Sequence, residues 1–427
     1  MTQQNAMTEK PAKIGFLRSQ LNKLGPGLIA GAADDDPSGI ATYSVAGAQF
    51  GLGLLWLSWF SWPLMAFVQM MCARIGMVTG VGLAGALRQR FPRPVLIVAC
   101  FALLAANSIN VGADLSGMAD AAELLTGISS HVYVVLLGGL ISYAVIRFRY
   151  HHVANVLKWL ALTLVAYIVT GFLVKPQWGA VFSAFAHISI PANGGFGMVV
   201  AILGTTISPY LFFWQAAQEV EEQKAMGRRM LKSRQHATTK EIKDRVFDVA
   251  FGTLSSNVVM FFVILCTALT LNANGMTTIT SSKEVAEALR PLAGNGAMLL
   301  YTVGIVGVGL LAIPTLTGSA AYAFSETFHW RGGLDEKWRR ARAFYGIIIF
   351  STLIGIAMDW LSINPVAALY WTAVINGVLA PFLLVGILMV ARDQKIMLGQ
   401  PSSIVSQVVV GITIILMFGA AVAMFLT

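Results

Sequence analysis

The sequence predicts an all-α membrane protein with 11 transmembrane helices, arranged as two inverted five-helix repeats with breaks in helices 1 and 6, as in amino-acid/sodium symporters. Three observations predict this class. The 427 residues are 56% hydrophobic and only 11% charged, which is too apolar for a soluble domain. Eleven apolar segments come near the roughly 20 residues that cross a bilayer. Two of these segments are interrupted by a small polar residue followed by proline.

The apolar segments divide the chain into four parts: a tail over 1–24, a first five-helix repeat over 25–194, a second over 195–391, and an eleventh helix within 392–427. The predicted spans are 25–50, 53–79, 94–116, 132–147, 155–175, 195–219, 246–272, 297–324, 343–360, 365–391 and 403–426.

The basic residues predict the orientation in the membrane. With the N-terminus inside, 26 of the 29 Lys and Arg residues fall in cytoplasmic pieces, and only Lys175, Lys283 and Arg290 fall outside. By the positive-inside rule the N-terminus is cytoplasmic and the C-terminus external, in a plasma or inner membrane. This placement explains the net charge of +9 without a nucleic-acid partner. The longest cytoplasmic loop, 224–245, predicts an amphipathic surface helix beside anionic lipid.

The first break lies within residues 25–50, where Asp34, Asp35 and Asp36 precede Pro37. A carboxylate at mid-membrane costs about 2.5 to 3.5 kcal/mol, so three in a row indicate a function. Pro37 removes a backbone donor and disfavours the α conformation at the residue before it. Broken helices persist at membrane depth only where protein or a watery cavity satisfies the freed backbone, which predicts an ion or substrate site.

The second break is Ser208-Pro209, whose proline lies 172 residues after Pro37. The two breaks fall in segments one and six, so each opens a block of five. Paired interruptions at matching places in two halves indicate a secondary transporter built from inverted repeats. The sequence contains no phosphate-binding loop of the kind that would indicate ATP-driven transport. We expect neither an enzyme activity nor a cofactor.

The breaks supply a set of candidate metal ligands. In each broken segment the first half-helix ends there, and the negative end of a helix dipole favours a cation. The ligands we expect are the Asp36 carboxylate, the Ala33 and Thr205 carbonyls and the Ser208 hydroxyl. These are all oxygens, which Mg²⁺, Mn²⁺ and Ca²⁺ prefer. The alternative for Asp36 is a local cap on the following helix.

The neighbouring carboxylates Asp34 and Asp35 cannot both face one ion with Asp36 on a continuous helix, because successive residues diverge by about 100°. They line an aqueous path, hold the outer shell of a hydrated ion, or pair with partners elsewhere. No histidine falls in mid-membrane, so a histidine proton relay is not predicted.

A second acidic cluster, Glu219, Glu221 and Glu222, ends segment six at its cytoplasmic side. It draws cations through the inner mouth or, alternatively, pairs with Arg228 or Arg229.

At these residues the chain resembles the Nramp family of divalent-metal transporters. DPSG stands where the family has DPGN, and LGTTISPYLFFWQ is similar to its G-A-T-x-M-P-H segment. Further similarities are ARIGMVTGVGLAGALRQRFP after segment two, FDVAFGTLSSNVV in segment seven, PTLTGSAAYAFSETF in segment eight and INGVLAPF in segment ten. The resemblance covers most of residues 25–391 and implies the same inverted-repeat fold.

The chain departs from the family motif at positions that bear on metal selectivity. Gly39 replaces the motif asparagine, and Ser208 replaces a methionine whose sulfur favours transition metals. Tyr210 and Gln215 stand where the family usually has histidines, and Gly117 stands where it has a glutamate beside the aspartate matched by Asp114. The resemblance implies ligand roles for Asp36, Ala33 and Thr205, and it extends them to Asn376, near a family glutamine, and to Asn257 in helix seven.

From these features we expect a carrier that moves a divalent cation, Mg²⁺ with Mn²⁺ also accepted, by alternating access, similar to the Nramp-related magnesium transporters. Asp34, Asp35, Gly39, Tyr210, Glu219 and Glu222 are expected along the permeation path. The first alternative is a proton-coupled Mn²⁺/Fe²⁺ symporter of ordinary Nramp type. The second is a transporter of an organic cation or amino acid, which needs an aromatic-lined pocket near Tyr210, Phe212 and Trp214. The expected partners are the ion and the bilayer, with no obligate protein partner.

Overall fold

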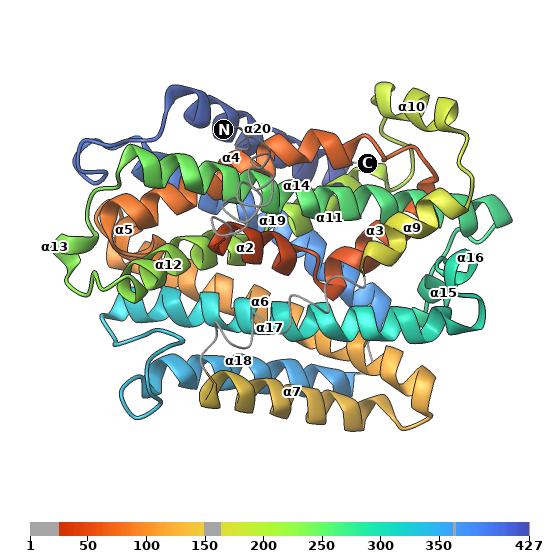
Figure 1. Cartoon of the computed structure of the whole chain (residues 1–427), viewed down its shortest axis with the longest axis horizontal. Coiled ribbons are helices and arrows are strands. Elements are labelled where there is room, and N and C mark those ends of the chain that lie inside the picture. Colours follow the sequence, from red (N-terminus) through yellow and green to blue (C-terminus); the bar gives the residue numbers. More distant parts are fainter. Residues whose placement is uncertain (1–24, 149–163, 362–363, 427) are drawn as a thin grey trace, which may run out of the picture.

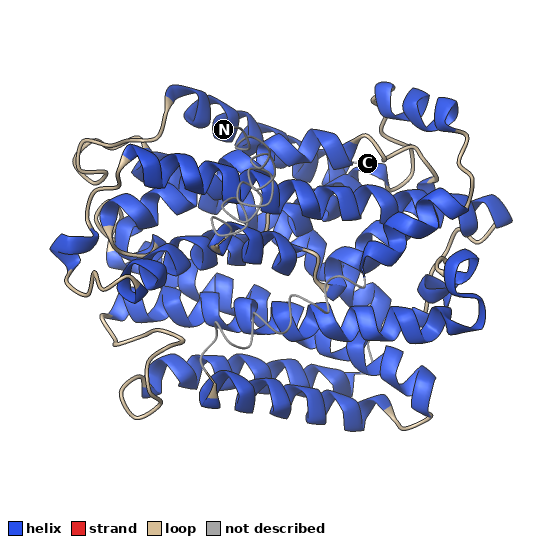
Figure 2. Ribbon diagram, in the orientation of Figure 1, coloured by secondary structure: helices blue, strands red, loops and turns tan. Residues whose placement is uncertain are grey.

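The computed structural model describes residues 25–148, 164–361 and 364–426, which form helices joined by turns and loops, with no strand among them (Figures 1 and 2). Nine helices in these ranges are long and apolar enough to cross a membrane. They correspond to the predicted segments 2 to 4 and 6 to 11. The first segment is the pair of half-helices described below, and the fifth lies partly in the undescribed residues 149–163. The predicted all-α transmembrane class is confirmed.

The helices of the first half begin and end as follows: α2 Pro26–Asp34, α3 Pro37–Phe50, α4 Leu57–Thr79, α5 Leu83–Leu87, α6 Arg93–Thr126, α7 Ser130–Arg147, α9 Val165–Leu173 and α10 Trp178–Ala186. Those of the second half are α11 Gly195–Thr206, α12 Pro209–Ala225, α13 Leu231–Arg234, α14 Thr239–Thr270, α15 Ser282–Glu287, α16 Arg290–Ala293, α17 Ala297–Phe328, α18 Arg342–Met358, α19 Pro365–Ala391 and α20 Ile404–Leu426. Three short 3₁₀ turns complete the list: η2 Asn272–Asn274, η3 Gly294–Gly296 and η4 Asp359–Leu361.

Both predicted helix breaks are present. α2 ends at Asp34 and α3 begins at Pro37, with Asp36 extended at φ −70° and ψ 171°. α11 ends at Thr206 and α12 begins at Pro209, with Ser208 extended at φ −79° and ψ 134°. The extended conformation is the one that a following proline favours.

The helices form two packed groups, which meet at the half-helices. α6, α7, α17 and α18 pack on one another in the lower part of Figure 1, while α2, α3, α4, α12 and α14 pack together above them. α11 packs against α19, and α19 packs against both α20 and α6. The half-helices α2 and α3 therefore lie in the interior of the bundle, where every described residue of α3 up to Ser44 is buried.

Glycines allow the broken helices to approach their neighbours closely. A Cβ atom on Gly31 of α2 would lie 2.3 Å from the carbonyl oxygen of Gly252 on α14. One on Gly204 of α11 would lie 2.3 Å from the backbone nitrogen of Gly377 on α19. Small residues at such crossings let membrane helices pack backbone to backbone.

The prediction of a surface helix over 224–245 is wrong. Only α13, a single turn over Leu231–Arg234, is helical between α12 and α14. Residues 239–245 form the first turns of α14, which begins earlier than predicted because of a capping box. The Thr238 hydroxyl accepts from the Glu241 backbone N–H (3.2 Å), and the Glu241 carboxylate accepts from the Thr238 N–H (2.8 Å).

We predict that Gly31→Ala lowers the free energy of unfolding by about 1 to 3 kcal/mol, because the added methyl group forces α2 away from α14. Gly139→Ala, on α7 with nothing within 4 Å of the new Cβ, is the matched control and is expected to stabilise by at most about 1 kcal/mol. Denaturant titration of the purified protein measures both. Equal stability of the two variants would contradict the backbone contact.

Candidate metal site

The two helix breaks touch each other. The Tyr210 hydroxyl on α12 donates to the Ala33 carbonyl oxygen on α2 at 2.9 Å. Gly39, on the other side of the first break, faces the second: a Cβ at this position would lie 3.0 Å from Thr205 Oγ1 and 3.4 Å from Asp36 Oδ1. Five of the predicted site and path residues thus come together at one place between the two half-helix pairs.

Asp36 lies at the centre of this contact and uses its two oxygens differently. Oδ1 accepts from the Gly39 backbone N–H at 2.6 Å, which caps α3. Oδ2 faces α6 and accepts from the Asn110 amide at 3.4 Å. The carboxylate is 2% exposed. The local cap, which we considered as an alternative, therefore involves only one oxygen and leaves the other directed at the site.

Two further helices contribute polar groups beside Asp36. Asn110 on α6 also donates to Asp114 Oδ2 at 3.1 Å, and the Asn376 amide on α19 donates to Asn110 Oδ1 at 3.0 Å. Asp114 Oδ1 and Asn376 Oδ1 are buried and have no hydrogen-bond partner in the described part of the chain. Unpartnered oxygens of this kind are costly in a dry interior and suit a hard cation.

At the second break, the serine hydroxyl hydrogen-bonds within its own segment. The Ser208 hydroxyl lies 2.8 Å from the Gly204 carbonyl oxygen and 2.6 Å from the Thr205 carbonyl oxygen, and it shares its one hydrogen between these two groups. Both Ser208 Oγ and the Thr205 carbonyl still have lone pairs, because a carbonyl or hydroxyl oxygen has two.

Asp34 and Asp35 face α14 instead of the Asp36 cluster. The Ser256 hydroxyl lies 2.7 Å from Asp34 Oδ2 and 3.0 Å from Asp35 Oδ1. Because a hydroxyl carries one hydrogen, it cannot donate fully to both. Of the three roles considered for these carboxylates, pairing with a partner elsewhere is the one with a visible contact.

Asn257 lies next to this serine but turns toward α4. Its amide accepts from Ser61 (2.8 Å) and donates to the Thr253 carbonyl (2.9 Å). Asn110 and Ser256, which hydrogen-bond to the carboxylates, are not among the residues predicted from the sequence. Asn110 has a detectable signal, because it and Asp114 are four residues apart and so share one face of an apolar helix. The sequence around Ser256 has no such signal.

Glu219 and Glu222 pair with a different basic residue from those expected from the sequence. Both pair with Arg245 of α14, at 2.7 Å for Glu219, instead of with Arg228 or Arg229. Arg228 itself pairs with Glu241 at 2.5 Å. The alternative that these glutamates are ion-paired therefore holds for Glu219 and Glu222, but the named partners were wrong, because Arg245 reaches them from the start of the next helix.

The central carboxylates, in contrast, have no basic partner. Asp34, Asp35, Asp36 and Asp114 are each at most 4% exposed, and none belongs to an ion pair in the described ranges. Uncompensated negative charge in the membrane interior is expensive, so these four groups require a cation or protons for neutralisation.

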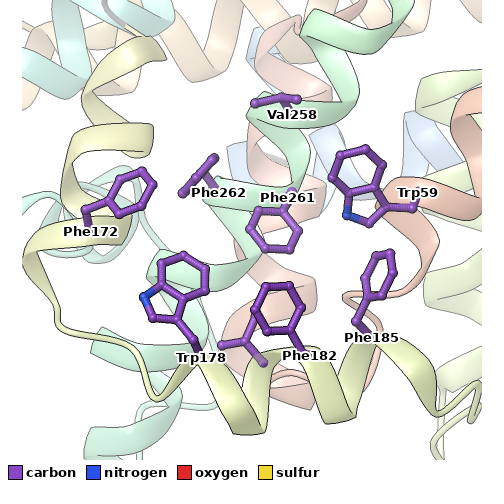
Figure 3. Close-up of a pocket in the computed structure, with 9 residues that line it drawn as sticks. Trp59, Phe172, Trp178, Phe182, Phe185, Val258, Phe261 and Phe262 are labelled. Atoms are coloured by element: carbon purple, nitrogen blue, oxygen red, sulfur yellow. The ribbon is translucent and has the colours of Figure 1, made fainter.

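A cavity lined by aromatic side chains lies elsewhere in the described structure. It has a volume of about 550 Å³, and Figure 3 shows the rings of α10 facing those of α9, α14 and α4. Its lining is Trp59, Phe172, Trp178, Val181, Phe182, Phe185, Val258, Phe261 and Phe262. No residue of either break lines it. The aromatic pocket that an organic-cation transporter needs near Tyr210, Phe212 and Trp214 is therefore not this one.

Comparison with known proteins identifies the same family as the motifs. The model of the Nramp family, described as natural resistance-associated macrophage protein-like, matches residues 27–427. A protein of Yersinia pestis (strain Pestoides F) named divalent metal cation transporter MntH is 27% identical over 312 residues, 71% of each chain. A protein of the same name from Erwinia tasmaniensis is 26% identical over 308 residues, 70% of each chain.

Solved structures share the fold. A crystal structure of the Eremococcus coleocola manganese transporter, in complex with an aromatic bis-isothiourea substituted compound, superposes with a TM-score of 0.75 at 20% identity, covering 98% of this chain and 88% of that one. The inward-facing conformation of Mhp1 superposes with a TM-score of 0.55 at 14% identity, covering 94% and 88%. Together with the family match over nearly the whole length, these findings establish that this multi-pass membrane protein belongs to the Nramp family.

Proposed function

We propose that this chain is a carrier that moves divalent metal ions across the membrane by alternating access, with Mn²⁺ as its first cargo. The observation that carries the proposal is the buried Asp36 carboxylate at the meeting point of two helix breaks, with one oxygen directed at the site. The relatives named as divalent metal cation and manganese transporters support Mn²⁺ better than the Mg²⁺ that the sequence analysis placed first.

Mg²⁺ is the second candidate, and the chemistry of the cluster is compatible with it. The side chains that hydrogen-bond to Asp36 and Asp114 offer only oxygen and amide groups, with no sulfur or imidazole. Carboxylate, carbonyl and water ligands suit Mg²⁺, Ca²⁺ and Mn²⁺ alike. Ser208 occupies the position of the family's methionine, whose sulfur would favour softer ions. Discrimination against Mg²⁺ therefore depends only on the size and geometry of the site.

Coupling to protons is the further part of the proposal. A divalent ion compensates two of the four buried carboxylates, and the other two require another cation or protons. Asp34 and Asp35 share one serine hydroxyl and no basic side chain, which supports protons as the second species. This favours the proton-coupled alternative of ordinary Nramp type over the uncoupled carrier.

Asp36→Ala is expected to reduce Mn²⁺ uptake into proteoliposomes to the level of protein-free vesicles, because it removes the charge that compensates the ion. Asp335→Asn, an exposed carboxylate outside the helices, is the control and should transport as the parent does. Retained uptake in Asp36→Ala would disprove the site.

An inward Mn²⁺ gradient is expected to acidify the interior of vesicles that contain the parent protein, as reported by an enclosed pH dye. In Asp35→Asn fewer protons should enter per Mn²⁺, because one protonatable group is lost. Mn²⁺ entry without any change of internal pH would refute the coupling while leaving the metal transport intact.

Ser208→Met is expected to shift the preference from Mg²⁺ toward Mn²⁺ and Cd²⁺, because a thioether is a soft ligand. Competition of each ion against Mn²⁺ uptake measures the shift. Ser208→Ala separates the effect of losing the hydroxyl from the effect of gaining sulfur. If Ser208→Met and Ser208→Ala rank the ions in the same order, this side chain does not reach the ion.

A further inference from the structure

A single buried carboxylate holds the start of the first half-helix. Asp248 on α14 is fully buried and accepts from three backbone N–H groups at the N-terminus of α2: Gly25 (2.8 Å), Gly27 (2.8 Å) and Leu28 (3.1 Å). These groups have no partner within the helix, and the positive end of the helix dipole attracts the carboxylate. Asp248 therefore caps a helix that is more than 200 residues away in sequence.

Arg245, one turn earlier on α14, connects this cap to the other broken helix. Its guanidinium pairs with Asp248 at 2.5 Å and with Glu219 of α12 at 2.7 Å, and it also contacts Glu222 of α12. Arg245 is 8% exposed. One planar donor group with several N–H bonds thus serves three carboxylates, a geometry that lysine cannot reproduce.

The network joins the outer ends of two half-helices whose inner ends form the candidate metal site. α2 runs from Pro26, beside the cap, to Asp34 at the first break, and α12 runs from Pro209 at the second break to Ala225, just beyond Glu222. Both network ends lie on the side where the basic loops predict the cytoplasm. Backbone contact at Gly27, where a Cβ would lie 2.7 Å from the Val249 nitrogen, holds α2 directly on α14.

We propose that Arg245 and Asp248 are positioning residues of the transport cycle. Together with Glu219 and Glu222 they form a network, called the latch below, that holds α2 on α12 and α14 while the ion is enclosed. The latch must open before the ion can leave toward the cytoplasm. This rests on the proposed function. Glu219 and Glu222, which we expected to attract cations at the inner mouth, are then parts of the latch. Glu222 has a side chain that is 29% exposed, so water reaches the network there first.

The test follows the accessibility of α2. Ala30 lies on α2 and is 2% exposed, so a cysteine there is shielded while the latch is closed. The reporter Ala30→Cys is placed in a chain whose three native cysteines, Cys72, Cys100 and Cys266, are replaced by alanine. A membrane-impermeant maleimide is then applied to the predicted cytoplasmic face of oriented vesicles, without metal.

Arg245→Ala and the milder Glu222→Gln are each expected to raise the labelling rate several-fold, because they shift the population toward the open state. Arg228→Ala is the matched control. It breaks an ion pair with Glu241 at the same end of the bundle, and that pair does not involve α2. It should label as slowly as the parent reporter.

Parent-like labelling of Glu222→Gln and Arg245→Ala in monodisperse protein would overturn the latch, as would equally fast labelling of Arg228→Ala. If Arg245→Ala does not fold, Glu222→Gln still decides. Because labelling needs no metal, failure of the parent to transport Mn²⁺ would count against the proposed function, whereas an unchanged labelling rate would count against the latch alone.

Discussion

The need to satisfy the backbone at two helix breaks inside the bundle is the constraint on which the rest of this structure depends. In lipid, each unpaired carbonyl or N–H costs several kcal/mol, roughly as for any buried polar group without a partner. Here, protein groups take these places: the Tyr210 hydroxyl on the Ala33 carbonyl, the Asp36 carboxylate on the start of α3, and the Asp248 carboxylate on the start of α2. Satisfying the breaks also brings them together, and their contact is the candidate site.

Charge is distributed very differently at the two ends of α2. At its C-terminal end, Asp34, Asp35 and Asp36 are buried without any basic partner in the described chain, and Asp114 adds to them from α6. At its N-terminal end, Asp248 is joined to Arg245 within an ion-pair network. The first arrangement has no basic side chain, whereas the second places one guanidinium among three carboxylates. This contrast separates the candidate metal site from the contacts that hold the helices.

The prolines show why only some of them break a helix. Pro63, Pro314 and Pro381 lie inside α4, α17 and α19, which continue through them. These prolines follow Trp62, Ile313 and Ala380, whereas the two at the breaks follow Asp36 and Ser208. Aspartate and serine favour the N-cap position, and proline favours the first position of a helix. At the first break the Asp36 side chain caps α3, whereas at the second the Ser208 hydroxyl bonds back to α11. The three prolines that follow apolar residues lie in helices that continue.

The sequence by itself determined the membrane class, the two breaks and the family, because hydropathy, N-cap chemistry and motifs are local properties of the chain. It also placed Asp36, Ala33 and Thr205 at the breaks, and their role as metal ligands stays a prediction. Only the tertiary structure decided which distant side chains meet them. Asn110 and Ser256 reach the carboxylates from α6 and α14, and Arg245 replaced the expected partners of Glu219, because pairing across 26 to more than 200 residues depends on how helices pack. No local pattern encodes that packing.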